Sequence, residues 1–175
     1  MGSRRNAGLR YETFKGEARR LAAEVAQSNR EAYLSQAIDP DRIRWEQINQ
    51  DAINAYQLWG SNEEFPWDQV VVEARRDNKA FGISLWYDAE LCGLCYATPR
   101  KSSISLKIVL LEGKPDTSHP LKGHVASLML MAIDGYARML QVSNIEVEDP
   151  AAGAVSLYQA LGFAFDSDGK LVIGV

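Results

Sequence analysis

The chain has 175 residues, of which 46% are hydrophobic and 24% are charged, and it carries a formal net charge of −4. These values are typical of one soluble globular domain, and a chain of this length needs neither a metal ion nor a disulfide to fold. The longest strongly apolar stretch, residues 125–133, is far shorter than the roughly 20 residues of a membrane span. The N-terminus lacks the apolar segment of a secretory signal, so the sequence predicts a cytoplasmic protein that does not contact a membrane.

The charges are unevenly distributed along the chain. In total 23 acidic side chains stand against 19 basic ones, which argues against binding to nucleic-acid backbones, since such binding usually needs a basic patch. Residues 144–175 hold five acidic side chains and a single basic one, Lys170. A site in this C-terminal part should therefore favour a cationic partner.

The first 78 residues are predicted to form one short strand and three helices. Brief alternation of apolar and polar residues indicates a strand at 9–14. Helix-forming residues predict a helix over 17–36, and apolar residues at helical spacing predict a second helix over 41–59. A short third helix is expected at 66–76.

From residue 80 the hydrophobic period changes from helical to extended. We expect an antiparallel meander of three strands, a loop and a long amphipathic helix, followed by a strand, a helix and two short strands. The predicted ranges, in that order, are 80–87, 91–98, 103–111, 112–120, 123–140, 143–148, 151–161, 163–165 and 171–175. The strand–helix–strand unit over 103–148 predicts parallel pairing of its two strands inside a mixed sheet.

The two cysteines, Cys92 and Cys95, have the spacing of a thiol redox pair. Such a pair stands at a helix N-terminus that lowers the thiol pKa, whereas the residues after Cys95 lead to Pro99 and do not begin a helix. In an extended strand the two side chains would also point to opposite faces. Both cysteines are therefore interpreted as packing residues, and with two distant histidines they make a poor zinc site.

One junction has the features of a phosphate-binding site. The predicted strand that ends at residues 109–111 leads through a loop into the helix that begins at residues 122–126. A helix N-terminus offers unpaired N–H groups and the positive end of a dipole, and small residues there let a ligand approach the backbone. Gly123 and Ala126 meet that need and Lys122 adds a cation, although many helices that start with glycine bind nothing.

The segment 144–163 contains the motif Ala154-x-x-Leu157-Tyr158-x-x-Leu161-Gly162-Phe163, and it resembles the closing segment of the GNAT superfamily of N-acetyltransferases. Together with the meander and the long helix, the resemblance covers about residues 80–175. It implies an α/β (α+β) fold with a mixed, mostly antiparallel sheet, in which two central parallel strands splay apart between flanking helices. It also implies a single domain over 1–175, with an N-terminal strand and substrate-side helices in 1–78 and an acyl-CoA-binding core in 79–175.

The same resemblance implies that acetyl-CoA enters the gap between the splayed strands as the acyl-donor cosubstrate, with no metal ion. The residues expected to contact it are Val109, Leu110 and Leu111 along the pantetheine, Lys122, Gly123, His124, Val125 and Ala126 around the pyrophosphate, and Ala154 and Tyr158 in the following helix. Three positions depart from the family pattern. Leu121 stands where the family has Arg or Gln, His124 replaces a glycine, and Ala151 replaces an asparagine.

Tyr158 is the first candidate catalytic residue. By resemblance it is the helix tyrosine that lies near the CoA sulfur and protonates the departing thiolate. A phenol, with a pKa of about 10, is a plausible proton source for a thiolate of slightly lower pKa. The alternative interpretation is a half-buried tyrosine that packs beside Leu157 and Leu161.

A base must also take a proton from the attacking amine. Glu112, at the end of the predicted strand, is one candidate, and Glu148, with its neighbour Glu146, is the other. The last two carboxylates are expected on one face of the sheet, about 7 Å apart, where mutual repulsion would raise one pKa. Lys107 could pair with such a glutamate, and a solvated strand face is the alternative for each acid.

The sequence therefore predicts an enzyme that transfers an acetyl group from acetyl-CoA to a primary amine by direct attack in a ternary complex. The acceptor would be a small cationic amine, or a lysine or N-terminus of a protein. Two alternatives stay open. One is a catalytically inactive domain that binds acyl-CoA, and the other is a protein-interaction domain whose nucleotide site does not bind CoA. Four tryptophans could line a pocket, pack in the core or mark a homodimer face: Trp45, Trp59, Trp67 and Trp86.

Overall fold

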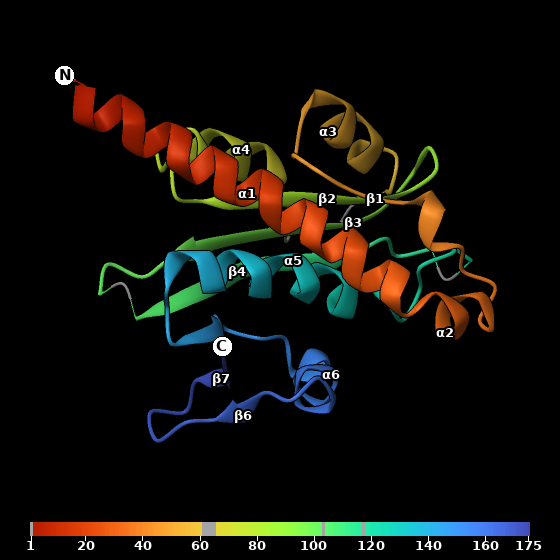
Figure 1. Cartoon of the computed structure of the whole chain (residues 1–175). Helices are drawn as coiled ribbons and strands as arrows, with labels where there is room; N and C mark the ends of the chain where they lie inside the picture. The colour runs from red at the N-terminus through yellow and green to blue at the C-terminus, as the bar shows by residue number, and fades with distance from the viewer. Residues whose placement is uncertain (1, 61–65, 103, 117) are drawn as a thin grey trace.

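A seven-stranded mixed sheet organises the computed structural model, which describes residues 2–60, 66–102, 104–116 and 118–175 (Figure 1). Its strands, in spatial order, are β1 (Ile43–Glu46), β2 (Phe81–Tyr87), β3 (Glu90–Pro99), β4 (Ser105–Gly113), β5 (Asn144–Val147), β7 (Leu171–Gly174) and β6 (Ala164–Phe165). Neighbouring strands run antiparallel except β4 and β5, which are parallel. The predicted meander and the predicted parallel pair are both confirmed.

Helices cover both faces of the sheet. They are α1 (Gly2–Ser28), α2 (Arg30–Leu34), α3 (Gln50–Gln57), α4 (Trp67–Ala74), α5 (Val125–Leu140) and α6 (Val155–Ala160), with short 3₁₀ turns at Pro40–Arg42 and Ala152–Ala154. α1 and α5 pack together over one face, and α3 and α4 lie on the opposite face (Figure 1). The helices predicted at 66–76, 123–140 and 151–161 are confirmed as α4, α5 and α6.

The core consists of two clusters of buried residues, one on each face of the sheet. Along β3, Cys95 and Ala97 belong to the cluster beneath α1 and α5, whereas Leu94 and Tyr96 belong to the cluster beneath α3 and α4. This alternation is the period of two that a strand imposes on its side chains. It explains why the strands of the meander are apolar on both faces.

The strand predicted at residues 9–14 is wrong, because these residues lie within α1. The buried face of α1 is a row of alanines, Ala18, Ala22 and Ala26, all fully buried. Small residues at this spacing let α1 approach α5 closely, and a Cβ built on Gly135 of α5 would stand 3.6 Å from the Cα of Ala18. Residues 9–14 continue this helix mostly exposed to solvent, and Phe14 packs against the core cluster that α1 and α5 cover.

The single helix predicted over 41–59 is also wrong, since the segment forms β1 and then α3. In β1 the buried Ile43 and Trp45 alternate with more exposed residues, and the indole N–H of Trp45 donates to the backbone oxygen of Leu128 in α5 at 2.9 Å. The helix begins only at Gln50, because the side chain of Asn49 accepts a hydrogen bond from the N–H of Ala52. The buried hydrogen bond between Trp45 and α5 thus favours a strand here, although the apolar residues are spaced as in a helix.

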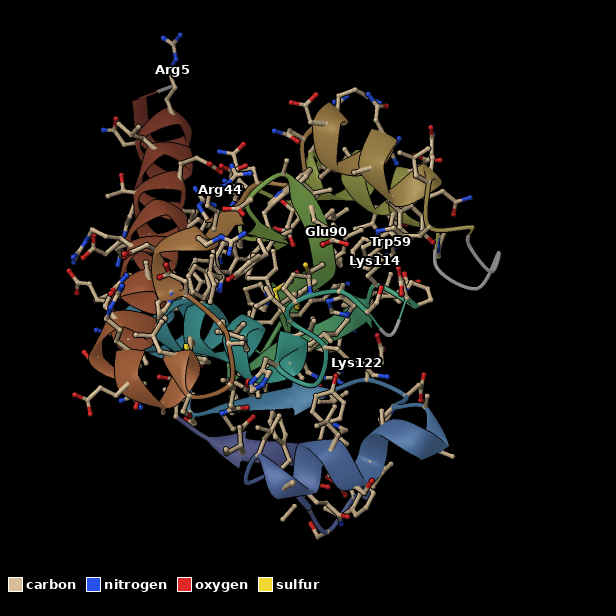
Figure 2. The ribbon with its side chains drawn as sticks, turned by 90° about the vertical axis from the view of Figure 1, so that its right-hand side faces the viewer. Arg5, Arg44, Trp59, Glu90, Lys114 and Lys122 are labelled. Atoms are coloured by element: carbon tan, nitrogen blue, oxygen red, sulfur yellow. The ribbon has the colours of Figure 1, made fainter. Side chains whose placement is uncertain are left out.

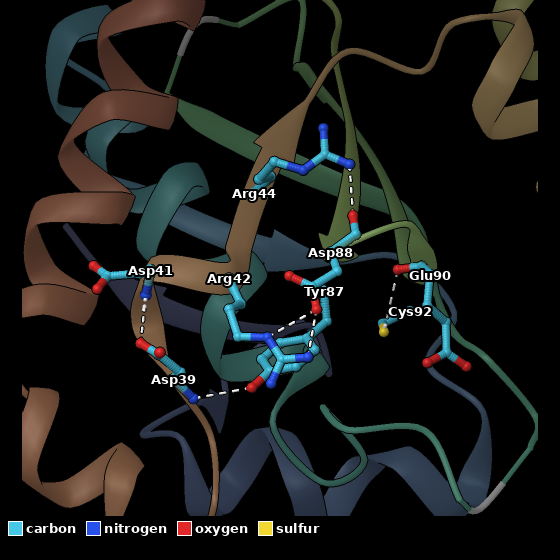
Figure 3. A network of polar contacts seen from close by, with 8 residues as sticks. All are labelled: Asp39, Asp41, Arg42, Arg44, Tyr87, Asp88, Glu90 and Cys92. Atoms are coloured by element: carbon cyan, nitrogen blue, oxygen red, sulfur yellow. Dashed lines mark hydrogen bonds and ion pairs between the residues drawn. The ribbon is translucent and has the colours of Figure 1, made fainter.

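A network of polar contacts holds the β2–β3 turn to β1 (Figure 3). Asp88, which has a positive φ of 52°, accepts from the guanidinium of Arg42 at its carboxylate and from Arg44 at its backbone oxygen. Arg42 also lies over the ring of Tyr87, whose hydroxyl accepts from the N–H of Asp39 at 3.1 Å. These contacts hold one end of the sheet, next to the loop that leads into α5.

Both cysteines are buried in the same cluster, so the expectation of opposite faces is wrong. Leu85 pairs with Gly93 and Trp86 with Leu91, which leaves Cys92 as the extra residue of a β-bulge. Burial raises the pKa of the Cys92 thiol to about 11 and that of the Cys95 thiol to about 12. The interpretation of both as packing residues agrees with this environment, because a raised pKa disfavours the reactive thiolate.

Gly93 sets how closely the start of α5 approaches the sheet. A Cβ at Gly93 would stand 2.5 Å from Cγ1 of Val125, a distance that real Cβ atoms do not adopt. We therefore expect Gly93→Ala to lower the free energy of unfolding by about 1–3 kcal/mol, measured by urea denaturation. The matched control is Gly113→Ala, whose Cβ would meet Val125 at an ordinary 3.6 Å. Equal stability losses in the two variants would contradict the assignment of Gly93 as the close contact.

Candidate active site

The parallel strands β4 and β5 separate halfway along β4. Of β4, only Ser105–Ile108 pair with β5, and the last bond between these two strands runs from the N–H of Glu148 to the oxygen of Ile108 at 3.1 Å. β4 continues to Gly113, still paired with β3 on its other side. Along residues 109–111, β4 therefore has a backbone edge with no strand beside it in the described structure. This is the gap predicted between two splayed strands.

A bulge in β4 lies at the point where the gap opens. Tyr96 of β3 pairs with Leu110 and Ala97 pairs with Ile108, so Val109 is the extra residue. A bulge bends its strand and turns its backbone groups away from the regular ladder. The three predicted backbone contacts, Val109, Leu110 and Leu111, are thus half-buried at an open and locally irregular edge.

The start of α5 lies beside this gap and has free backbone donors. The N-cap residue His124 makes no side-chain cap, and its own N–H donates to the oxygen of Leu121 at 2.9 Å. Among the described residues, the N–H groups of Gly123, Val125 and Ala126 have no acceptor. Unpaired donors and the positive end of the helix dipole favour an anion at this point.

The side chains at the start of α5 separate into packing and exposed residues. Leu121 is fully buried, so the position at which the GNAT pattern has Arg or Gln serves the core in this chain. Lys122 and Gly123 are exposed, and Gly123 adopts a φ of +83°, which side chains other than glycine rarely tolerate. Lys122 is therefore the cation at the helix start (Figure 2).

Tyr158 of α6 is buried, with 5% of its surface exposed, and it packs edge-on against Phe163 at 5.4 Å between ring centroids. Burial raises the pKa of the Tyr158 hydroxyl above its usual value, and the nearby Cys95 adds to the effect. The phenol is therefore protonated at neutral pH, and its hydroxyl has no hydrogen-bond partner among the described residues. Ala154 stands half-buried just before α6, and Ala151 is exposed without a side-chain cap.

Glu112 lies on the face of the sheet opposite to α5. One of its carboxylate oxygens accepts a hydrogen bond from the indole N–H of Trp67 at 2.7 Å, and the side chain is half-buried. Burial raises the pKa of Glu112, and the Trp67 hydrogen bond partly opposes that rise. The sequence contains no signal for this contact, because the two residues are 45 positions apart.

Glu146 and Glu148 each have a cation of their own, so the predicted mutually repelling pair is not what the fold builds. Arg100 pairs with Glu146, which is almost fully buried. The Lys107 ammonium lies 3.1 Å from a carboxylate oxygen of Glu148, which confirms the suggested ion pair. Their charges are locally neutralised, whereas Glu112 makes no ion pair with any described residue. Of the three acids, Glu112 has the environment of a base.

A cavity of about 510 Å³ opens near the loop that leads into α5. Trp59, Leu91 and Pro120 are among its lining residues, and the ion pair of Lys114 with Glu90, 2.7 Å long, stands at its wall. Figure 2 shows Trp59, Glu90 and Lys114 close together on the side of the molecule where Lys122 lies. Trp59 is thus the tryptophan that lines a cavity, whereas Trp45, Trp67 and Trp86 are buried in the core.

The fold brings most of the predicted site residues to one end of the sheet. The open edge of β4 and the start of α5 lie at this end of the sheet, Tyr158 is buried on the face that α5 covers, and Glu112 is on the opposite face. Tyr158 belongs to the core cluster beneath α5, and the Glu112 carboxylate contacts Trp67 in the cluster beneath α4. The Tyr158 phenol and the Glu112 carboxylate therefore belong to opposite faces of the sheet.

Comparison of the sequence with protein-family models and with curated proteins finds no match. Solved structures, in contrast, share the fold. Ard1 from Thermoplasma volcanium superposes with a TM-score of 0.58 at 13% identity, over 77% of this chain and 98% of that one. A mutant of the spermidine N-acetyltransferase SpeG from Vibrio cholerae superposes with a TM-score of 0.58 at 14% identity, over 77% of this chain and 94% of that one.

An acetyltransferase from Bacillus subtilis in complex with CoA gives a TM-score of 0.55 at 19% identity, over 77% of this chain and 98% of that one. The chain therefore has the fold of the GNAT N-acetyltransferases. Within the described ranges, no helix combines the length and apolar character that crossing a bilayer demands, the 27-residue α1 included.

The contact between Trp67 and Glu112 can be tested without any substrate. The indole N–H stabilises the charged carboxylate, so Trp67→Phe should raise the pKa of Glu112 further above its usual value. Carboxyl ¹³C NMR over a pH titration measures the shift, with Glu112→Gln to assign the resonance. Trp86→Phe is the matched control, because the Trp86 indole donates to Ser84 instead. An unchanged or lowered pKa in Trp67→Phe would show that the hydrogen bond does not act on this carboxylate.

Proposed function

We propose that the protein is an N-acetyltransferase that transfers an acetyl group from acetyl-CoA to a primary amine by direct attack in a ternary complex. The observation that carries the proposal is the gap between β4 and β5. A free backbone edge of β4 borders it, and the start of α5, with N–H groups that have no acceptor among the described residues, lies at the same end of the sheet. The buried phenol of Tyr158 belongs to the core cluster on the α5 face. A solved structure of the same fold was determined in complex with CoA, which supports this use of the gap.

In this proposal the backbone of Val109, Leu110 and Leu111 pairs with the pantetheine arm of acetyl-CoA. The free N–H groups at the start of α5 hold the pyrophosphate, and Lys122 adds a positive charge. Leu121 does not take part, since it is buried in the core. The binding therefore rests on backbone groups and one exposed lysine rather than on the arginine or glutamine of the family pattern.

Catalysis would combine positioning with two proton transfers. Glu112, directly or through a water molecule, takes the proton from the attacking amine, and its raised pKa suits a base that works near neutrality. The amine nitrogen then forms a bond to the thioester carbon and the carbon–sulfur bond breaks. Tyr158 gives its proton to the departing thiolate, which leaves an amide and free CoA, and the proton taken up by Glu112 returns through solvent to the Tyr158 phenolate.

The acceptor would be a small cationic amine, or a lysine or N-terminus of a protein, that approaches from the face of α3 and α4. Residues 1–78 would supply that acceptor side and residues 79–175 the acyl-CoA side, within one domain. Two acids that made the C-terminal part look anionic, Glu146 and Glu148, are paired with Arg100 and Lys107. The half-buried Glu112 is therefore the acid that would attract the amine. We place the reaction in the cytoplasm, and a homodimer is compatible with it.

Binding of acetyl-CoA should depend on the charge at the start of α5. We expect Lys122→Glu to weaken binding about tenfold or more in isothermal titration calorimetry, because the helix N-terminus attracts phosphate and the new carboxylate repels it. The matched control is Lys101→Glu, an equal charge reversal in the exposed β3–β4 turn, which should bind like the unchanged protein. Absence of any acetyl-CoA binding to the unchanged protein would overturn the proposal.

Tyr158→Phe should separate catalysis from binding. We expect kcat for thiol release in the presence of an accepted amine to fall about 100-fold or more, while acetyl-CoA affinity stays within about twofold. Phenylalanine keeps the packing against Phe163, so the thermal unfolding temperature should stay nearly unchanged. Full activity in the variant would remove Tyr158 from the mechanism. Binding without turnover by the unchanged protein, over a screen of amines, would favour an inactive acyl-CoA-binding domain.

A further inference from the structure

A second cavity, of about 550 Å³, lies away from the proposed acetyl-CoA site, where α1 and α4 meet at the edge of the sheet. β1 pairs only with residues 84–87 of β2, so residues 81–83 of β2 have no strand on this side in the described structure. The backbone that leads into α3 crosses there, and Ile48 comes within 3.2 Å of where a Cβ on Gly82 would stand. The proposed acyl-CoA and catalytic residues are not among those that line this cavity.

The cavity contains a cation, Arg19, that has no ionic or hydrogen-bond partner within the described part of the chain. Arg19 of α1 is half-buried, and its guanidinium makes no hydrogen bond or ion pair with any described residue; its nearest aromatic contact is Phe81, at 6.0 Å from the ring centroid. Burial lowers the pKa of Arg19, and Glu12 and Glu46 oppose that effect only from a distance. Both carboxylates already have other cations, since Glu12 holds Lys15 at 2.8 Å and Glu46 pairs with Arg44.

The remaining walls combine positive charge, amide groups and apolar surface. Lys15, Arg19 and Arg75 line the cavity against the single acid Glu12, so its lining is net positive. α3 begins at the cavity wall, and the positive end of its dipole adds to this potential. Side-chain amides, among them Gln47, offer hydrogen bonds, and the apolar residues of α4 form the opposite wall.

A half-buried guanidinium that makes no hydrogen bond or ion pair with a described residue has lost part of its hydration without gaining polar contacts in return. A protein keeps such a group where a ligand completes it, and a volume of this size is typical of small-molecule sites. We propose that this cavity binds a small organic anion, a carboxylate on an apolar body, with the Arg19 guanidinium holding the carboxylate. The guanidinium geometry suits two parallel hydrogen bonds to the two carboxylate oxygens. This site goes beyond the proposed acetyl transfer and does not depend on it.

The test uses phenylacetate and hexanoate as probes, each paired with its uncharged amide, and follows amide resonances by ¹H–¹⁵N NMR. We expect saturable shifts around Gly82 and Asn49 with a Kd of about 1 mM, and at least about tenfold weaker binding of the amides. Arg19→Gln should lose most of the affinity, whereas Arg20→Gln, the same charge change at an exposed neighbour, should keep it. Equal binding of the amides, equal binding to Arg19→Gln, or no saturable shift with either carboxylate would each overturn the proposal.

A stability measurement separates a binding role from a structural one. Without a ligand, Arg19→Met should be as stable as the unchanged protein or more so, because it removes an uncompensated charge and keeps the apolar stem. A Tm lowered by more than about 4 °C would assign Arg19 to the fold and overturn the proposal. Phenylacetate should raise the Tm of the unchanged protein and leave that of Arg19→Met unaffected. Acetyl-CoA binding should be the same in both, so failure of this site is distinguishable from failure of the transferase site.

Discussion

The short parallel pairing between β4 and β5 is the constraint on which the candidate site depends. Two parallel strands require a crossover connection, and α5 supplies it on the face that α1 also covers. The start of α5 must then lie at the carboxyl end of β4, which is where the two strands separate. A free backbone edge and a positive helix end are thus brought together by topology, as at the ligand sites of other open α/β sheets.

Two local features of the strands shape the gap between β4 and β5. Gly93 leaves room for Val125, so the first turn of α5 approaches the sheet closely, and the bulge at Val109 marks the place where pairing with β5 ends. Tyr158 and Glu112 are then held on the two faces of the sheet by partners of their own, Phe163 and Trp67. The two side chains to which the proposal gives the proton transfers are therefore on opposite faces of the sheet.

The charge distribution in the folded protein differs from the distribution along the sequence. Counting residues made the C-terminal part appear anionic, yet Arg100 and Lys107, which precede it in the chain, neutralise Glu146 and Glu148. In contrast, Arg19 lines a cavity and makes no hydrogen bond or ion pair with any described residue, although its helix also holds the ion pairs of Lys15 and Arg20. The burial and the ion pairing of each charged side chain, rather than the number of charges in a segment, thus decide where the protein can attract an ion.

The sequence alone determined the C-terminal half of the fold, because there the local period and the final environment agree. The meander, α5 and the parallel pair follow from patterns of two and of 3.6 residues, whereas the motif around Tyr158 was found by its resemblance to the GNAT superfamily. Only the tertiary structure decided that residues 9–14 continue α1, where Phe14 packs against the core, and that 41–59 divides into β1 and α3, where the Trp45 indole donates to the backbone oxygen of Leu128. It also decided the partners of Glu112 and Glu146, because contacts between residues 45 or 46 positions apart leave no local signal.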